Sequence, residues 1–376
     1  MKQKSLAAYL FFLLLIFSTA CSDNWEIDIT SQGSTVQTFS SEQIDFYLDQ
    51  STGSISEIPL GQVLYDSGFS IVDTITLKLN DGSTSAFDWE LVAATATISA
   101  SGTVTISNTD YTPTSIEVNP SSLATKIEWS IMDIAPTMAH ALDIPNPPES
   151  VGVKRIEGSA DYGLMILLDG LQFEKLMQLI ETEKLSFFQQ HQDEIQKGLT
   201  VYPSISTSAS AALLTSAPPQ VNGVFGYGYR STETVTLFDL ATQAGLVVKA
   251  VEGDSLAFNL RNAETMLSGD RDGDGFSDDN VLENSLDVIR SGMPELMYIH
   301  FHNIDDLGHS FGPNSAEYVE AIIRVDGYLA EIYETLPNNT LIAIFADHGM
   351  HVTEEGGNHG TLVADDMIIP ILLIQK

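Results

Sequence analysis

The stretch YGLMILLDG at residues 162–170 decides the fold, together with MYIHFHNID at 297–305 and TLIAIFADHG at 340–349. Each is an apolar run that leads into an aspartate. Apolar runs of this length without polar alternation are typical of strands buried on both faces of a sheet. In open parallel α/β sheets, ligands bind outside the carboxyl ends of the strands. We therefore expect the aspartates at these strand ends to meet in one cleft: Asp169, Asp305 and Asp347.

The rest of the chain allows more than one hydrophobic core, because 43% of its 376 residues are hydrophobic. Residues 126–376 carry the buried strands and predict an α/β domain, with a mostly parallel sheet flanked by helices. Residues 22–120 are richer in Ser and Thr and contain alternating stretches such as 74–79 and 95–107. This texture predicts a separate, small, mostly β domain, which we expect to be a spacer or a binding module.

Short motifs follow one another along the α/β part. Asp169-Gly170 ends the first strand, and the serine-rich segment YPSISTSASAALLTSAPPQVNGV spans 202–224. Asp-x-x-Gly-His spans 305–309, Asp-His-Gly spans 347–349, and Asn-His-Gly spans 358–360. Each motif alone is weak evidence, since Asp-His-Gly on its own is more often a turn. In this order they resemble the alkaline phosphatase superfamily, and most closely its type I phosphodiesterase and nucleotide pyrophosphatase branch.

The resemblance implies a two-metal hydrolase that acts on small phosphate esters through a phosphoseryl intermediate. Carboxylates and imidazoles are ligands suited to Zn²⁺, with Mn²⁺ as the alternative metal. Two such ions can hold the attacking and the leaving oxygen of an in-line displacement. The implied ligands of one ion, besides the nucleophile oxygen, are Asp169, Asp347 and His348. Those of the other ion are Asp305, His309 and His359.

The resemblance also indicates the nucleophile. In the family it precedes the Thr of a Thr-Gly pair by nine residues, and nine residues before Thr215 is Ser206. Thr207 is the runner-up. The residues that follow predict a helix start, where free N–H groups favour an alkoxide and a bound phosphate; the alternative role for Ser206 is a helix cap. The chain departs from the family at Ser216, where glycine is usual, and at Ala209, where asparagine is common.

Alternatives to a phosphoric ester hydrolase remain open on the sequence alone. A sulfatase uses a modified Cys or Ser followed by x-Pro-Ser-Arg, but STSAS at 206–210 lacks both the proline and the arginine. A surface binding module could retain the fold without activity. His300 and His302 lie two residues apart, on one strand face, and predict a supporting role beside the metals rather than ligation.

A calcium loop is a further hypothesis, carried by DRDGDGFSDD at 270–279. Its first acids have the spacing of an oxygen-only Ca²⁺ loop with glycine at the turn. Val281 stands where such loops carry glutamate, so one of the last two acids would have to close the loop. The alternative is a solvated acidic turn. The candidate ligands are Asp270, Asp272, Asp274, Asp278 and Asp279.

The N-terminus predicts export. Residues 1–21 begin with Lys2 and Lys4 and continue with an apolar stretch at 6–17, which is too short to span a bilayer. The stretch ends just before Cys21, the only cysteine, as in bacterial lipoprotein signals. We expect Cys21 to be lipidated and to anchor the protein outside the cytoplasm. The alternative is ordinary cleavage after Ala20, which would leave a secreted or periplasmic protein.

The formal net charge of −35 argues against nucleic acids and anionic membrane surfaces as partners. We therefore expect no nucleic-acid binding.

The segment DIAPTMAHALDIPNPP at 133–148 points to a rearranged chain order. It resembles the helix and loop that follow the last core strand at the C-terminal end of superfamily members. Here it precedes the first core strand, and the chain ends after the apolar run 367–374. This order predicts a circular permutation, which is tolerated where termini lie close together. The alternative is a coincidental amphipathic helix.

Overall fold

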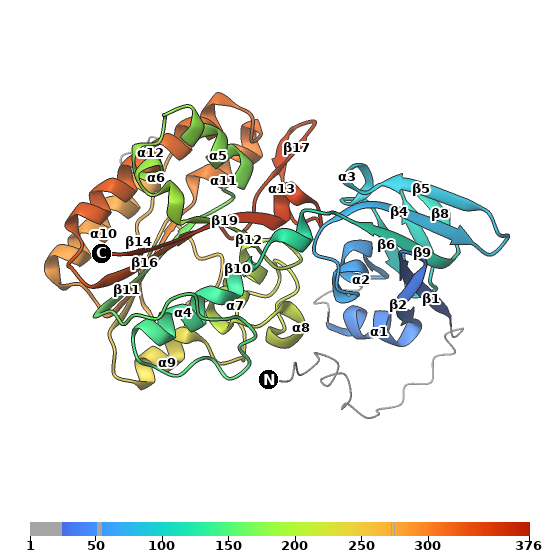
Figure 1. The fold of residues 1–376 in the computed structure, drawn as a ribbon, viewed down its shortest axis with the longest axis horizontal. Helices are drawn as coiled ribbons and strands as arrows, with labels where there is room; N and C mark the ends of the chain where they lie inside the picture. The colour runs from blue at the N-terminus through green and yellow to red at the C-terminus, as the bar shows by residue number, and fades with distance from the viewer. Residues whose placement is uncertain (1–24, 51–54, 272, 274) are drawn as a thin grey trace.

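The structure is a computed structural model that describes residues 25–50, 55–271, 273 and 275–376. Figure 1 shows a large α/β part beside a smaller β-rich part that holds the N-terminal elements. The predicted fold class is confirmed. Among these described residues, no helix is both long and apolar enough to cross a bilayer.

The α/β part is built on one large sheet with strand order β10-β12-β19-β16-β11-β15-β13-β14. Its strands run parallel, except that β19 pairs antiparallel with both β12 and β16. Residues of β11, β15 and β16 are almost all buried, as their apolar composition predicts. The bounds are β10 Trp129–Ser130, β11 Tyr162–Leu168, β12 Ile195–Leu199, β13 Val248–Glu252, β14 Glu264–Leu267, β15 Leu296–Phe301, β16 Thr340–Phe345 and β19 Ile368–Gln375.

Helices cover both faces of this sheet. In Figure 1, α4, α7 and α9 lie on one side, and α5, α6, α10, α11 and α12 lie on the other. A small hairpin, β17 His351–Thr353 and β18 Gly356–Asn358, stands beside the sheet. The helix bounds are α4 Ile134–Ala141, α5 Phe173–Glu181, α6 Ser186–Gln190, α7 Ser206–Thr215, α8 Pro219–Asn222, α9 Leu237–Gln243, α10 Asp278–Gly292, α11 Asn303–Phe311, α12 Ala316–Thr335 and α13 Ala364–Met367.

The strand register brings two of the predicted acids to one edge. Leu168 of β11 pairs with Phe301 of β15, and Leu167 pairs with Phe345 of β16, so these strands end level with one another. Asp169 comes directly after β11, and Asp347 follows β16 by two residues. The carboxyl ends of parallel strands thus deliver both side chains to the same place.

The expectation that Asp305 ends a strand is wrong. This residue does not end a strand, because β15 stops at Phe301 and α11 begins at Asn303. The two carboxylate oxygens of Asp278 accept hydrogen bonds from the N–H groups of His302 (2.8 Å) and Asn303 (3.1 Å). These free N–H groups at a helix start are satisfied by a residue distant in sequence. Asp305 is therefore in the first turn of α11.

Helix α4 occupies most of the segment for which a permutation is predicted. Ile134 and Met138 are buried, and a side chain added at Gly163 of β11 would lie 3.2 Å from Leu142 and 3.3 Å from Met138. The helix therefore covers the centre of one sheet face. β19 is the next strand but one from β11, beyond β16. A circular permutation relative to the superfamily stays a prediction, because it concerns chain order in other proteins.

The β-rich part combines two sheets, β2-β1-β9-β4-β5 and β3-β6-β7-β8, with three short helices among its described residues. Its core continues into the α/β part, because Tyr202, Leu362 and Met367 pack in the same cluster as Ile58 and Trp89. The bounds are β1 Glu26–Ser31, β2 Ser34–Ser40, α1 Ser41–Gln50, β3 Glu57–Pro59, α2 Leu60–Asp66, β4 Val72–Leu79, β5 Thr84–Asp88, α3 Trp89–Val92, β6 Thr97–Ser99, β7 Val104–Ile106, β8 Thr109–Tyr111 and β9 Pro113–Pro120.

Candidate metal centre

The residues predicted to bind metal converge from separate elements. Asp169 follows β11, Asp347 and His348 follow β16, and His359 follows β18. Asp305 and His309 lie on α11, one helical turn apart and so on one face. Ser206 is the first residue of α7.

One group of contacts centres on His348. Its Nε2 lies 3.3 Å from Asp169 Oδ1, 3.3 Å from Asp347 Oδ2 and 3.3 Å from Ser206 Oγ. Asp169, Asp347 and His348 are all buried, and their ligand atoms lie within 4.8 Å of one another, close enough to hold one ion.

A second group adjoins the first. His309 Nε2 lies 3.3 Å from Asp305 Oδ2 and 3.0 Å from His359 Nε2, while His359 Nε2 lies 3.6 Å from Asp305 Oδ1. The rings of His348 and His359 stack with their centroids 3.6 Å apart, which joins the two groups. Asp305, His359 and His348 also have the spacing to hold one ion.

The aspartates fit a pair of cations. One carboxylate oxygen of each has a neighbour in the protein: His300 contacts Asp169 Oδ2, the N–H groups of Gly170 and His348 donate to Asp347 Oδ1, and Asp305 Oδ2 lies 3.3 Å from the predicted ligand atom His309 Nε2. Within the described residues, the other oxygen of each is buried without a hydrogen-bond partner. A buried acceptor left unpaired is costly, and here a bound cation would satisfy it. These oxygens are Asp169 Oδ1, Asp305 Oδ1 and Asp347 Oδ2.

The histidines are oriented as metal ligands usually are. The Nδ1 of His309 lies 3.1 Å from the carbonyl oxygen of Gly357, and the Nδ1 of His348 lies 3.0 Å from that of Gly349. The Nδ1 of His359 lies 3.0 Å from the carbonyl of Ser204. An Nδ1–H that donates to a carbonyl fixes the tautomer and leaves Nε2 with its lone pair toward the centre.

The pKa values of the buried side chains reflect the carboxylates that lie close together at the centre. Burial, and then the neighbouring carboxylates of Asp347 and Asp305, raise the pKa of Asp169 well above its usual value. Burial opposes protonation of His348, but the surrounding carboxylates prevail and raise its pKa to about 9. Burial and the adjacent His348 lower the pKa of His359 to about 3. A divalent cation among these groups would offset the carboxylate charges that raise the pKa of Asp169 and of His348.

Gly170 makes room for this arrangement. A Cβ at this position would lie 2.7 Å from Asp305 Oδ1 and 2.9 Å from Asp305 Cβ, and the backbone has a φ of +69°. Only glycine adopts this conformation at so close an approach without strain. The close approach of Asp305 thus explains why glycine follows Asp169 in the first motif.

The hydroxyl that faces the centre is that of Ser206. It makes no helix cap, because Ile205 precedes α7 as the cap residue without a side-chain bond. The Thr207 hydroxyl instead donates to the carbonyl of Gly226 at 3.2 Å, and the Ser208 hydroxyl donates to that of Val224 at 3.0 Å. The geometry therefore favours Ser206 over Thr207 as nucleophile.

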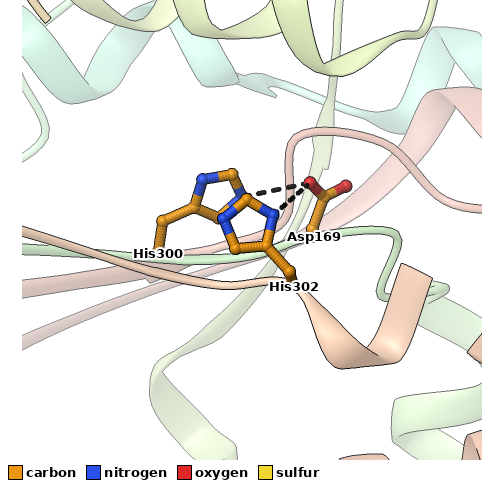
Figure 2. A group of neighbouring side chains, drawn as sticks. All are labelled: Asp169, His300 and His302. Atoms are coloured by element: carbon orange, nitrogen blue, oxygen red, sulfur yellow. Dashed lines mark hydrogen bonds and ion pairs between the residues drawn. The ribbon is translucent and has the colours of Figure 1, made fainter. Parts of the chain in front are cut away.

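A supporting group lies behind Asp169 (Figure 2). The ring of His300 bridges two carboxylates, with Nε2 3.0 Å from Asp169 Oδ2 and Nδ1 2.9 Å from Glu252 Oε2. The ring of His302 lies tilted by 35° against that of His300, with centroids 3.7 Å apart, and its Nε2 lies 3.1 Å from the same Glu252 oxygen. Asp169, His300 and His302 themselves have metal-ligand spacing. We interpret the contacts as orienting Asp169, so that Oδ1 is directed to His348 Nε2 at 3.3 Å.

Two residues at or beside the centre were not identified by the sequence analysis. Glu252 is the last residue of β13, so the rule that marked Asp169 would have found it had its strand been recognised. Tyr227 belongs to no motif, yet its hydroxyl lies 3.5 Å from His359 Nε2 and its side chain is 56% exposed at the centre. Burial of the hydroxyl, and then the Asp305 carboxylate, raise the pKa of Tyr227 above its usual value. The phenol therefore stays protonated and can donate.

Two predicted features remain untested by these contacts. In the acidic loop, Asp270 accepts from the N–H groups of Gly273 and Gly275, Asp278 binds the start of α11, and Asp279 accepts from Asn280. Asp272 and Asp274 lie outside the described residues, so the calcium loop stays a prediction. Cys21 and the export signal also lie outside them.

Residues 261–369 match the family model of type I phosphodiesterase / nucleotide pyrophosphatase. This match confirms the resemblance predicted from the motifs. The matched range contains five of the predicted ligands: Asp305, His309, Asp347, His348 and His359. Asp169 and Ser206 precede the matched range.

Two further comparisons concern individual proteins. The chain is 29% identical over 104 residues to the human GPI ethanolamine phosphate transferase 3 catalytic subunit, a match that covers 28% of this chain and 8% of that protein. It therefore spans a small fraction of this curated relative. Phosphonoacetate hydrolase from Sinorhizobium meliloti, in complex with phosphonoformate, aligns with 19% identity and a TM-score of 0.42, covering 55% of this chain and 60% of that one.

Proposed function

We propose that this chain is a metal-dependent phosphoric ester hydrolase with a serine nucleophile and a two-metal centre. One observation carries the proposal: unpartnered oxygens of Asp169, Asp305 and Asp347 converge with imidazole Nε2 atoms beside a serine hydroxyl. Carboxylate and imidazole donors in this number suit Zn²⁺, with Mn²⁺ as the alternative. Asp169, Asp347 and His348 would hold one ion, and Asp305, His309 and His359 the other.

The chemistry assigned to the chain is a double displacement at phosphorus. Ser206 Oγ attacks the phosphorus atom and loses its proton, while the ester oxygen departs with the bond electrons and takes up a proton. Water then cleaves the phosphoseryl bond and releases phosphate from a monoester substrate, or a phosphate monoester from a diester substrate. Bound metal ions supply the positive charge that lowers the pKa of the serine hydroxyl and stabilises the departing oxygen. The first turn of α7 adds free N–H groups beside Ser206 for the phosphoryl oxygens.

The direct test offers the purified protein chromogenic phosphate monoesters, phosphate diesters and a sulfate ester, with and without added Zn²⁺. We expect zinc-dependent turnover of at least one phosphate class, faster than turnover of the sulfate ester. The lack of proline and arginine after Ser206 supports this order. Preferred hydrolysis of the sulfate ester would favour the sulfatase alternative, and no turnover with metals bound would favour a binding module.

Tyr227 is proposed to donate a hydrogen bond to a phosphoryl oxygen, because its hydroxyl lies at the metal centre beside His359. Tyr227→Phe keeps the ring and removes this donor. We expect kcat/KM to fall by about a hundredfold, as when one donor to a developing oxyanion is lost, with metal content unchanged. Steady-state kinetics and metal analysis check this. Tyr229→Phe, on the same loop, is the control; equal losses in both variants would refute the assignment.

Location and domain roles complete the proposal. We propose that residues 1–21 direct export and that lipidated Cys21 anchors the protein to a membrane, with residues 22–120 as the accessory domain and 126–376 as the hydrolase domain. The support is the apolar stretch at 6–17 before the only cysteine. Mass spectrometry of the mature N-terminus would identify a lipidated cysteine, or a free one if cleavage is ordinary.

A further inference from the structure

A cavity of about 680 Å³ opens in the β-rich part, where that part meets α8. Its walls come from β2, α1, α2 and the residues after α2, and Gln220 of α8 closes it on the other side. None of the residues of the metal centre lines it. The cavity is therefore separate from the proposed catalytic site and large enough for a small organic molecule.

Aromatic rings make up much of the cavity wall. Phe39 and Phe69 are buried beneath it, Tyr47 and Tyr65 are partly exposed, and Phe46 is 49% exposed at its rim. Aromatic faces carry partial negative charge and attract cations, especially where water is excluded. Rings arranged around one space thus favour a positively charged guest with an apolar surface.

The polar groups of the cavity also favour a positively charged ligand. Asp66, the last residue of α2, and Glu42 of α1 both line it, and among the described lining residues there is no Lys, Arg or His. The carboxylate of Asp66 accepts from the amide of Gln62 at 3.0 Å and also from Tyr47 and Gln220. These are neutral donors, so they orient the Asp66 side chain and add no positive charge beside it.

We propose that this cavity binds a small organic cation of the alkylammonium class. The aromatic rings would enclose the alkyl groups, and Asp66 would supply the counter-charge. Burial raises the pKa of Asp66 to about 7, as expected for a desolvated carboxylate, and a bound cation would favour its ionised form. An uncharged sugar is the competing ligand, because amides and carboxylates also bind hydroxyl groups. A sugar carries no positive charge, however, so it would not gain the ion pair with Asp66 that a cation would form.

The site also joins the two parts of the molecule. The amide of Gln220 reaches Asp66 across the boundary, and the ring of Tyr47 packs edge-on against Phe225 with centroids 5.8 Å apart. Phe225 is two residues from Tyr227, which reaches the metal centre. A guest in the cavity would therefore contact both parts.

The test uses the full chain and titration calorimetry with choline and with its uncharged isostere, in which carbon replaces the quaternary nitrogen. The isostere has the same shape, so it separates charge recognition from simple burial. We expect saturable binding of choline, at least about tenfold tighter than binding of the isostere. No saturable binding of choline, equal affinities for the pair, or preferential binding of neutral sugars would each overturn the proposal.

Variants locate the binding within the cavity. Asp66→Asn keeps the size of the side chain and should abolish the preference for choline, whereas Asp45→Asn removes a charge from an α1 residue that does not line the cavity and should leave it intact. Phe46→Leu removes an exposed ring face and should weaken choline binding more than binding of the isostere. Melting temperatures check that each variant is folded. A preference unchanged in both Asp66→Asn and Phe46→Leu would place the binding elsewhere and refute the assignment.

Discussion

Replacing Ser206 by alanine is expected to lower kcat by at least about a thousandfold, because the proposed route has no other nucleophile at the metal centre. The metals should stay bound, since the carboxylates and imidazoles that would hold them are unchanged. Phosphate ester turnover and metal content, measured on the same preparation, check both halves of the expectation. Trapping of a phosphorylated serine in the unmodified protein would identify the intermediate directly.

Thr207→Val is the matched control for this variant. The Thr207 hydroxyl is occupied by the carbonyl of Gly226, so its loss should reduce activity little compared with the loss of the Ser206 hydroxyl. Turnover retained in Ser206→Ala but abolished in Thr207→Val would transfer the role to Thr207. Turnover retained in both variants would exclude a covalent mechanism through this segment.

Removal of metal is expected to abolish turnover and to destabilise the fold. Asp169, Asp305 and Asp347 each have a buried oxygen without a hydrogen-bond partner, and the charges of Asp347 and Asp305 act unfavourably on that of Asp169, so without cations the carboxylates repel. A ligand present at a thousandfold excess over its dissociation constant stabilises the folded state by about 4 kcal/mol. A chelator should therefore lower the melting temperature, and added Zn²⁺ should restore both stability and turnover. Melting curves and activity before and after chelation measure this effect.

The matched pair Asp305→Asn and Asp306→Asn separates ligation from general charge. The acids are neighbours on α11, but the Asp305 side chain lies at the centre with one oxygen unpartnered. Asp305→Asn should lose one metal per chain and most of the turnover, whereas Asp306→Asn should keep both metals. Equal metal loss in the two variants, or a chelated protein with unchanged melting temperature and turnover, would contradict the two-metal assignment.

The convergence of the candidate ligands could be predicted from the sequence because most of the signal is local. Strand runs such as 162–168 and 340–345 are read from composition, and parallel strands necessarily deliver the residues after them to one edge. The spacing of Asp305 and His309 places both on one face of a helix whichever residue begins that helix. The nine-residue spacing before Thr215, which the family resemblance supplies, indicated Ser206, and its hydroxyl lies 3.3 Å from His348 Nε2.

Other features depended on contacts between distant residues. The expected strand before Asp305 is cut short because Asp278, 24 residues before His302, binds the N–H groups that start α11. No local sequence pattern predicts such a partner, because a carboxylate from any point in the sequence can accept hydrogen bonds from the free N–H groups at a helix start.

Tyr227 and Glu252 show the same limit on the functional side. Each reaches the metal centre or its support by packing rather than by spacing within a motif. The cavity beside Asp66 likewise exists only where α1 and α2 meet α8, which lies more than 150 residues further along the chain. The sequence by itself therefore determined the fold class, the central strands β11 and β16, and the candidate ligand and nucleophile residues, because these follow from periodicity and short-range spacing. Only the tertiary structure decided which oxygens are held, which are left for a cation, and which rings enclose a second cavity, because those depend on side chains brought together from distant parts of the chain.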